Sequence, residues 1–288
     1  MSEFHGLLLH TMACPHLDPF GALDLAETLA LDGIELIVQS GYRAAIDPDA
    51  SPGDMRSLAR AARERRIPIA ALVSYEKGMT HADSGIRADA VKKLDHALSL
   101  AAELGAEIIR VFAGQDVASM AGRDAAVERM CDALRPLGDR AHSLGVALCI
   151  ENHMDTLATS AAATVEIVNA IGHTAFGIVY DQPNLDFIKA EGFPQGFDLQ
   201  KGKLKHVHVK DFFWTETGER WATVVGEGIV PWDRIIGALT ADRYTGYLSL
   251  EYEARWFPHQ LPPPEIGLAR SRDCVRRLQR ECRSRKHA

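Results

Sequence analysis

The sequence lacks the features that mark membrane, secreted and nucleic-acid-binding proteins. No run approaches the roughly 20 consecutive apolar residues that a membrane-spanning helix needs. The opening MSEFHGLLLHTMAC has no basic stretch followed by a long apolar one, so we expect no secretory signal. The net charge of −7 disfavours non-specific attraction to nucleic-acid phosphates. We therefore expect a cytoplasmic protein with no membrane and no nucleic-acid partner.

Paired cysteines and linker segments are also missing. The five cysteines are scattered without CxxC spacing, which favours a reducing compartment. No stretch rich in proline, glycine or serine divides the chain. Of the 288 residues, 47% are hydrophobic, which is enough for one large core. Residues 1–288 are therefore predicted to form a single domain.

What the sequence does contain is a regular alternation of strand-like and helical segments. Residues 87–104, for example, place apolar side chains at three-to-four spacing, and Gly105 follows as a helix-end signal. The strand-like runs are continuously apolar, as expected for strands buried on both faces. Eight such runs predict an α/β fold, a (β/α)8 TIM barrel: 6–12, 33–39, 68–75, 106–114, 146–153, 176–182, 204–212 and 246–253. The long connections 212–230 and 254–264, after the seventh and eighth strands, are predicted to form lids or pocket walls.

Four of the strand-like runs end in a side chain that can bind a metal ion. VALCIE closes on Glu151, FGIVYD on Asp181 and GYLSLE on Glu251, while LKHVHV carries His208 near its end. The C-terminal ends of parallel barrel strands open onto one face, so these four groups are predicted to converge. Three carboxylates and one imidazole favour a single divalent ion, Mn²⁺ first, with Mg²⁺, Co²⁺ and Zn²⁺ as alternatives.

Three further polar side chains interrupt the apolar runs. His206 shares the side-chain direction of His208 but lies one layer deeper, so it is predicted to be a hydrogen-bonded core histidine. Glu35 and Arg110 are charges within otherwise apolar strands, and a buried charge needs a partner. Both are predicted to form ion pairs or to orient other residues.

The segments IENH, YDQPN, HVHVKD, VGEGIVPW and LEYE resemble the xylose-isomerase-like TIM-barrel superfamily of sugar and sugar-phosphate isomerases and epimerases. The resemblance spans about residues 106–253. It implies that the family's single divalent metal is held by Glu151, Asp181, His208 and Glu251. From the ketose-epimerase members, it also implies that the two glutamates act as an acid/base pair on opposite faces of the sugar.

Other positions near these motifs are predicted to contact the substrate. Lys210 follows His208 by two residues, and His153 follows Glu151 by two, so each shares the inward direction of its neighbour. Asn184 stands where epimerase members often carry a histidine, and Trp214 stands where some carry an arginine. Leu157 replaces a glutamate of the same subgroup. These three departures weigh against a free-ketose 3-epimerase specifically.

The chemistry expected of such a site is proton removal next to a carbonyl. A divalent cation would stabilise the resulting enediolate as a Lewis acid, and a carboxylate would take the proton. If the proton returns to the sugar, the protein is a sugar isomerase or epimerase, which is the leading prediction. Loss of a β-hydroxyl would instead give a dehydratase of a dehydro-sugar or dehydroshikimate-like substrate, with Lys210 or His153 as the proton donor. A non-catalytic sugar-binding barrel is the third reading, and an apurinic-site endonuclease is disfavoured because further histidines are missing.

The last predictions concern the C-terminal segment and the partners of the protein. The basic run from Arg270 to Lys286 is predicted to be a solvated last helix whose Val275, Leu278 and Cys282 pack on the barrel. The expected partner is a small sugar or polyol-derived molecule, and a homo-oligomer is kept as an option.

Overall fold

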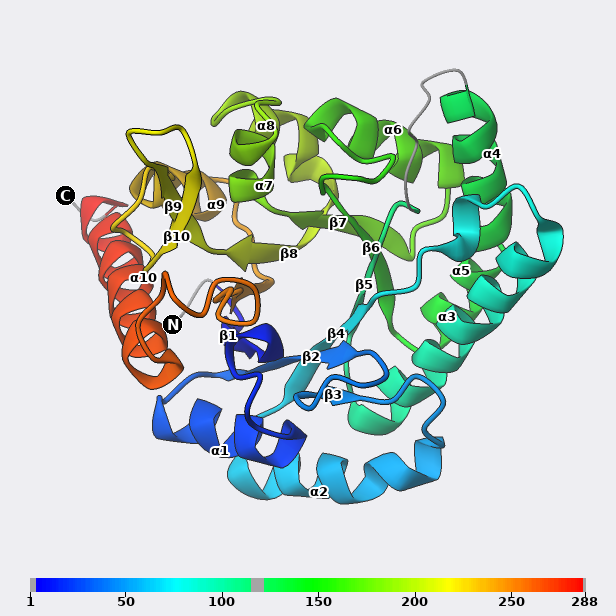
Figure 1. Cartoon of the computed structure of the whole chain (residues 1–288), viewed down its shortest axis with the longest axis horizontal. Coiled ribbons are helices and arrows are strands. Elements are labelled where there is room, and N and C mark those ends of the chain that lie inside the picture. Colours follow the sequence, from blue (N-terminus) through cyan, green and yellow to red (C-terminus); the bar gives the residue numbers. More distant parts are fainter. Residues whose placement is uncertain (1–3, 115–121, 287–288) are drawn as a thin grey trace.

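The computed structural model describes residues 4–114 and 122–286, which form a closed barrel of eight parallel strands surrounded by helices (Figure 1). The ring runs β1-β11-β8-β7-β6-β5-β4-β2, and pairing of β1 with β2 closes it. The strands of the ring are β1 (Gly6–His10), β2 (Gly33–Val38), β4 (Ile69–Ser74), β5 (Ile108–Val111), β6 (Ala147–Glu151), β7 (Phe176–Tyr180), β8 (Leu204–Val209) and β11 (Tyr247–Leu250). The short β3 (Ala45–Ile46) pairs with β2 outside the ring. The predicted single-domain TIM barrel is confirmed.

The helices lie around the outside of the ring, as Figure 1 shows. They are α1 (Pro19–Thr28), α2 (Arg56–Arg65), α3 (Ser84–Leu104), α4 (Arg123–Leu134), α5 (Leu137–Ser143), α6 (Ala161–Ile171), α7 (Gln182–Phe187), α8 (Gln195–Gln200), α9 (Trp232–Ala241) and α10 (Pro264–Lys286). Their ends follow from local sequence. Asp83 and Ser160 accept backbone N–H bonds at the starts of α3 and α6, and Gly105 and Gly172 end them with φ of 77° and 70°. No helix in the described ranges is long and apolar enough to cross a membrane.

The segment after β8 is more ordered than the predicted long loop. β9 (Asp211–Trp214) and β10 (Arg220–Thr223) form an antiparallel hairpin. Asp211 then organises the following Gly-Glu-Gly turn, because its carboxylate accepts the backbone N–H groups of Gly226 (2.9 Å), Gly228 (3.2 Å) and Val230 (3.2 Å). A β-carbon on Gly228 would lie 2.1 Å from Asp211 Oδ1, so only glycine fits there. Residues 212–230, predicted as a lid or pocket wall, therefore contain a hairpin followed by a turn that this carboxylate orders.

The two ends of the chain meet at a seam beside β1. Strand β1 pairs with β2 on one side and with β11 on the other, so the first strand of the chain lies beside the last. Helix α10 reaches across this seam. Arg272 and Arg276 donate hydrogen bonds to the carbonyls of Leu29 and Ala30, just beyond the end of α1. The buried Val275 and the packing of Cys282 against the core confirm the predicted last helix.

The interior of the barrel is divided into an apolar and a polar half. Strands β4, β5, β6 and β7 contribute one apolar cluster, Ala71, Ile108, Cys149 and Val179, and their only charges among the described residues are Arg110 and Glu151 at the C-terminal ends of β5 and β6. The opposite half carries buried polar side chains from β1, β2, β8 and β11. Glu35 of β2 contacts both His206 and His208 of β8, and these two strands are not neighbours in the ring, so the contacts cross the interior.

Candidate metal centre and active site

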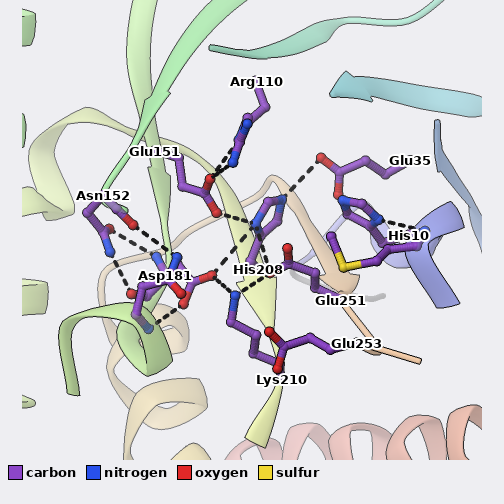
Figure 2. A network of polar contacts seen from close by, with 12 residues as sticks. His10, Glu35, Arg110, Glu151, Asn152, Asp181, His208, Lys210, Glu251 and Glu253 are labelled. Atoms are coloured by element: carbon purple, nitrogen blue, oxygen red, sulfur yellow. Dashed lines mark hydrogen bonds and ion pairs between the residues drawn. The ribbon is translucent and has the colours of Figure 1, made fainter. Parts of the chain in front are cut away.

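The structure brings the four predicted ligands together at the C-terminal end of the barrel (Figure 2). Glu151 is the last residue of β6, Asp181 follows β7, His208 lies in β8, and Glu251 follows β11. One ligand atom of each lies within 4.8 Å of the others, and all four side chains are buried. His208 Nδ1 is 2.9 Å from Glu151 Oε1, 3.4 Å from Glu251 Oε2 and 3.8 Å from Asp181 Oδ2. The sequence pattern therefore located a real three-dimensional cluster.

The chemistry of this cluster fits a divalent cation. Asp181 Oδ2 is buried and accepts no hydrogen bond from any residue that the structure describes, although the Lys210 ammonium lies 2.7 Å away as an ion pair. Burial, together with the nearby Glu251 and Glu151 carboxylates, raises the pKa of Asp181 to about 7 against the opposing pull of Lys210. Three crowded carboxylates with an under-satisfied oxygen form a site that a divalent ion would stabilise, and the oxygen-rich donor set suits a hard cation.

Asp181 is held in place by an amide clamp. Asn152 Oδ1 accepts the backbone N–H of Asp181 (3.1 Å), and Asn152 Nδ2 donates to its carbonyl (2.6 Å). Asp181 Oδ1 accepts the backbone N–H of Asn184 at the start of α7 (2.8 Å), which leaves Oδ2 to face the cluster. The Asn184 side chain donates to the Asn152 carbonyl (3.1 Å). The structure thus places Asn184, predicted as a substrate contact, against the loop that orients Asp181.

The two glutamates of the cluster have different surroundings. Glu151 Oε2 receives Arg110 Nε (2.6 Å) and also contacts the same guanidinium through Nη2. Burial by itself would raise the pKa of Glu151, but Arg110 and then His208 outweigh burial and hold the pKa well below its usual range. Glu251 Oε2 contacts Lys210 and His208, while no contact within residues 4–114 and 122–286 engages its Oε1. One glutamate is pinned at both oxygens, and the other keeps one oxygen free.

Lys210 lies at the mouth of the cluster. Its Nζ is 2.6 Å from Glu251 Oε2 and 2.7 Å from Asp181 Oδ2, and the side chain is only 6% exposed. Burial would lower the pKa of this ammonium, but Asp181 and Glu251 raise it above its usual range. The indole N–H of Trp232 donates to the Lys210 carbonyl (3.0 Å) and fixes the backbone there. The lysine is therefore a positioned cation and not a solvated one.

His153 and Trp214 occupy different places in the structure. His153 is half-buried beside Phe112, with ring centroids 5.0 Å apart, and its Nδ1 lies 2.6 Å from the Met154 carbonyl. Burial lowers its pKa, so the ring is neutral near pH 7. Trp214 ends β9, stacks on Phe187 at 6.0 Å, and is 37% exposed. Within the part of the chain that the structure describes, no contact joins Trp214 to the four ligands.

The deeper polar residues bear out one expectation and add a residue that sequence reasoning missed. His206 is a buried core histidine hydrogen-bonded to Glu35, as predicted. His10, the missed residue, is fully buried, and its ring lies 5.5 Å from that of His208. It closes the apolar run GLLLH, so the same strand-end rule that found the four ligands would have found it. Burial lowers the pKa of His10 to about 4.

Comparison with known proteins places this geometry in a family. The sequence model of the xylose isomerase-like TIM barrels matches residues 23–278. An inosose dehydratase from Lacticaseibacillus casei is 24% identical over 140 residues, covering 44% of this chain and 47% of the relative, so the match spans about half the relative's length. A D-psicose 3-epimerase from Agrobacterium fabrum is 24% identical over 213 residues, covering 70% of each chain.

Solved structures share the fold at low sequence identity. An L-ribulose 3-epimerase superimposes with a TM-score of 0.81 and 18% identity, covering 98% of this chain and 97% of that one. A xylose isomerase-like TIM barrel protein from Mycobacterium smegmatis, solved in complex with magnesium, gives a TM-score of 0.75 at 17% identity, covering 96% and 97%. These neighbours establish the architecture, and they include a member that binds a divalent metal.

Proposed function

The chain belongs to the xylose isomerase-like TIM-barrel family, and from that premise we propose that it is a divalent-metal-dependent enzyme acting on a small polyhydroxylated ketone. The proposed step is removal of a proton from a carbon next to the carbonyl. The observation that carries this proposal is the convergence of four buried ligand-type groups, with an under-satisfied Asp181 oxygen among them.

Glu151, Asp181, His208 and Glu251 would hold the ion, which we propose to be Mn²⁺, with Mg²⁺, Co²⁺ or Zn²⁺ as alternatives. A bound divalent ion supplies Lewis acidity to a carbonyl oxygen that gains negative charge. The remaining chemistry belongs to the protein. The free Oε1 of Glu251 is available to accept the proton, and Lys210 stands beside it as a cation that can hold a substrate oxygen.

The fate of the abstracted proton decides the reaction class. Isomerisation or epimerisation, the leading prediction from the sequence, uses Glu151 and Glu251 as an acid/base pair. Epimerisation in particular needs a second acid/base group on the opposite face of the substrate. The Arg110 guanidinium engages Glu151 Oε2, so that oxygen is not free to move a proton. This asymmetry disfavours epimerisation and suits a reaction that uses a single carboxylate base, as dehydration does.

Dehydration needs one base and one proton donor for the departing hydroxyl. Glu251 supplies the base, and Lys210, whose ammonium contacts Glu251, supplies the donor in this proposal. His153, the other donor considered from the sequence, is less suited because its neutral ring already donates its Nδ1 proton to the Met154 carbonyl. We therefore propose a metal-dependent dehydratase of a polyhydroxylated ketone as the best-supported activity, with isomerase or epimerase as the competing one.

Proton NMR in D₂O separates these outcomes. The Mn²⁺-loaded and chelated proteins would be incubated with inosose, D-psicose and L-ribulose and sampled after the Mn²⁺ is removed. A dehydratase releases water and forms an unsaturated or keto-enol product. An isomerase or epimerase exchanges a C–H for deuterium and retains the hydroxyl groups. Turnover of neither kind by a metal-loaded protein over a wider set of ketones would leave a sugar-binding barrel and refute the proposal.

A further inference from the structure

We propose that Glu35 is a positioning residue that fixes the tautomer of His208 and thereby sets the affinity of the site for a divalent cation. The inference rests on the proposed function, since it assumes that His208 is a cation ligand. Glu35 lies on β2, across the barrel interior from β8, and is fully buried. Figure 2 shows it approaching His208 from the side opposite Glu151.

One carboxylate holds two imidazole rings. Glu35 Oε1 is 3.2 Å from His208 Nε2, and Glu35 Oε2 is 3.1 Å from His206 Nε2. Both rings are fully buried, so water does not compete for these contacts. An ionised carboxylate only accepts hydrogen bonds, so each ring nitrogen that faces it carries a proton.

This arrangement decides which nitrogen of His208 can bind a cation. Both nitrogens of His208 face carboxylates, Nε2 facing Glu35 and Nδ1 facing Glu151, so both carry a proton when no cation is bound. A cation at the cluster would displace the proton on Nδ1, while Glu35 would keep the other proton on Nε2 and so leave the Nδ1 lone pair for the cation. Nδ1 is the atom that faces the cluster, 2.9 Å from Glu151 Oε1. Without Glu35, the remaining proton could move to Nδ1 and be donated to Glu151, which would remove the lone pair from the site. A carboxylate behind a metal-binding histidine acts in this way in other proteins.

The same residues could be taken for a second cation site, because ligand atoms of His10, Glu35 and His208 also lie within 4.8 Å of one another. The tautomer of His10 argues against that reading. His10 Nδ1 accepts the backbone N–H of Met12 at 3.0 Å, so the proton of the neutral ring is on Nε2. A protonated nitrogen cannot bind a metal ion. His208 Nε2 is likewise protonated towards Glu35, so the inner group has no pair of free imidazole donors.

His206 provides a matched control for the experiment. It bonds the same carboxylate at nearly the same distance and is equally buried. Among the described residues, however, no hydrogen bond or ion pair joins His206 to Glu151, Asp181 or Glu251. The His206 ring packs edge-on against His208, with ring centroids 5.5 Å apart, but holds neither of its nitrogens. Removing His206 therefore leaves the hydrogen bonds of the four ligands in place, whereas altering Glu35 changes the hydrogen bond to His208 Nε2.

The test compares Glu35→Gln, Glu35→Asp and His206→Gln in the full chain. Mn²⁺ affinity of the chelated protein is measured by isothermal titration calorimetry, and stability by the thermal unfolding midpoint. Glu35→Gln is expected to weaken Mn²⁺ binding by about 10- to 100-fold, the range found for second partners of metal-binding histidines. Its amide can turn an N–H₂ group towards His208 and so favour the wrong tautomer. Glu35→Asp keeps the charge, and its Mn²⁺ affinity is expected to lie between those of wild type and Glu35→Gln.

His206→Gln is expected to lower the unfolding midpoint while leaving Mn²⁺ affinity within about threefold of wild type. Equal Mn²⁺ affinity of Glu35→Gln and wild type would overturn the inference, as would an equal loss in His206→Gln. If Glu35→Gln does not fold, the Glu35→Asp affinity and the visible spectrum of the Co²⁺-loaded protein, which reports histidine ligation, decide the matter. A wild type that binds Mn²⁺ but turns over no ketone rejects the proposed activity and leaves this inference standing.

Discussion

The two halves of the barrel interior differ in the polarity of the side chains that they bury. The half formed by β4, β5, β6 and β7 packs Ala71, Ile108, Cys149 and Val179 into an apolar cluster. The half formed by β1, β2, β8 and β11 buries His10, Glu35, His206, His208 and Ser249. Burying polar groups costs free energy unless they are hydrogen-bonded, so the polar half is tolerated only through its internal contacts.

The four ligands come from both halves. Glu151 ends β6 and Asp181 follows β7 on the apolar side, while His208 lies in β8 and Glu251 follows β11 on the polar side. The apolar half lowers the local dielectric and strengthens electrostatic interactions above it, and the polar half fixes the orientation of the histidine. In this barrel, the candidate metal centre thus lies between an apolar cluster on one side and a set of hydrogen-bonded polar residues on the other.

The largest expected effect comes from removing a ligand on either side of this boundary. Asp181→Asn and His208→Ala are expected to lose the bound ion and all activity together, because each deletes a donor from a four-donor set. Elemental analysis is expected to give one metal per chain for wild type and none for either variant. Chelation should abolish activity, and Mn²⁺ or Co²⁺ should restore it best. Three metals per chain, or full activity after exhaustive chelation, would contradict the site.

The next prediction is that replacing Glu251 mainly lowers kcat, whereas replacing Glu151 mainly lowers stability. Glu251→Gln is expected to lower kcat by roughly 10³-fold, the range for losing an acid/base group, while retaining part of the metal affinity. Glu151→Gln is expected to lose about 3 kcal/mol of stability or more, because it leaves Arg110 buried without its carboxylate partner. The rate of deuterium incorporation measures the loss of activity in Glu251→Gln. Equilibrium chemical denaturation measures the loss of stability in Glu151→Gln.

Glu253→Gln serves as the control for that pair, since Glu253 is also buried and follows Glu251 by two residues but contacts Arg220 instead of the cluster. Its kcat is expected to stay within about tenfold of wild type, because it removes no acid/base group. Near-normal turnover of Glu251→Gln would withdraw its role as the base.

Replacement of Lys210, at the mouth of the site, is expected to have a smaller effect on the kinetics. If the Lys210 ammonium holds a substrate oxygen that gains charge during the reaction, Lys210→Met should lower kcat more than it raises KM. An anchor for a distant anionic group would instead raise KM and leave kcat nearly unchanged. Steady-state kinetics with the identified ketone distinguish these cases, and a silent variant would remove Lys210 from the site.

The smallest effects test the contrast between the two halves directly. Val179→Thr places a hydroxyl in the apolar cluster at constant volume, and is expected to cost about 1–3 kcal/mol because the hydroxyl loses its water among Ala71, Ile108 and Cys149. Ser249→Ala makes the opposite change. Ser249 Oγ is buried and has no hydrogen-bond partner among the described residues, so its removal should be neutral or slightly stabilising. Equal destabilisation by both would show that the division of the interior has no energetic basis.

Much of this arrangement could be read from the sequence because it depends on strand periodicity. Continuous apolar runs gave the order of strands, and the rule that strand ends share one face located Glu151, Asp181, His208 and Glu251. The contact between Arg110 and Glu151 could not be read in this way, since it depends on the register of β5 against β6, where Arg110 stands opposite Cys149. The order of the turn after the β9–β10 hairpin could not be read either, because Asp211 holds Gly226 and Val230 from 15 and 19 residues away in the sequence.

The seam between β1 and β11 has a consequence for how the protein is made. These strands come from opposite ends of the chain, and contacts of such high sequence separation form late and slowly. During translation the growing sheet keeps exposed edges until Leu250 leaves the ribosome, and unpaired edges invite association with other chains. Glu251 follows that last strand directly, so the complete set of four ligands exists only after the ring has closed. The proposed cation would therefore meet its complete ligand set only in the closed barrel.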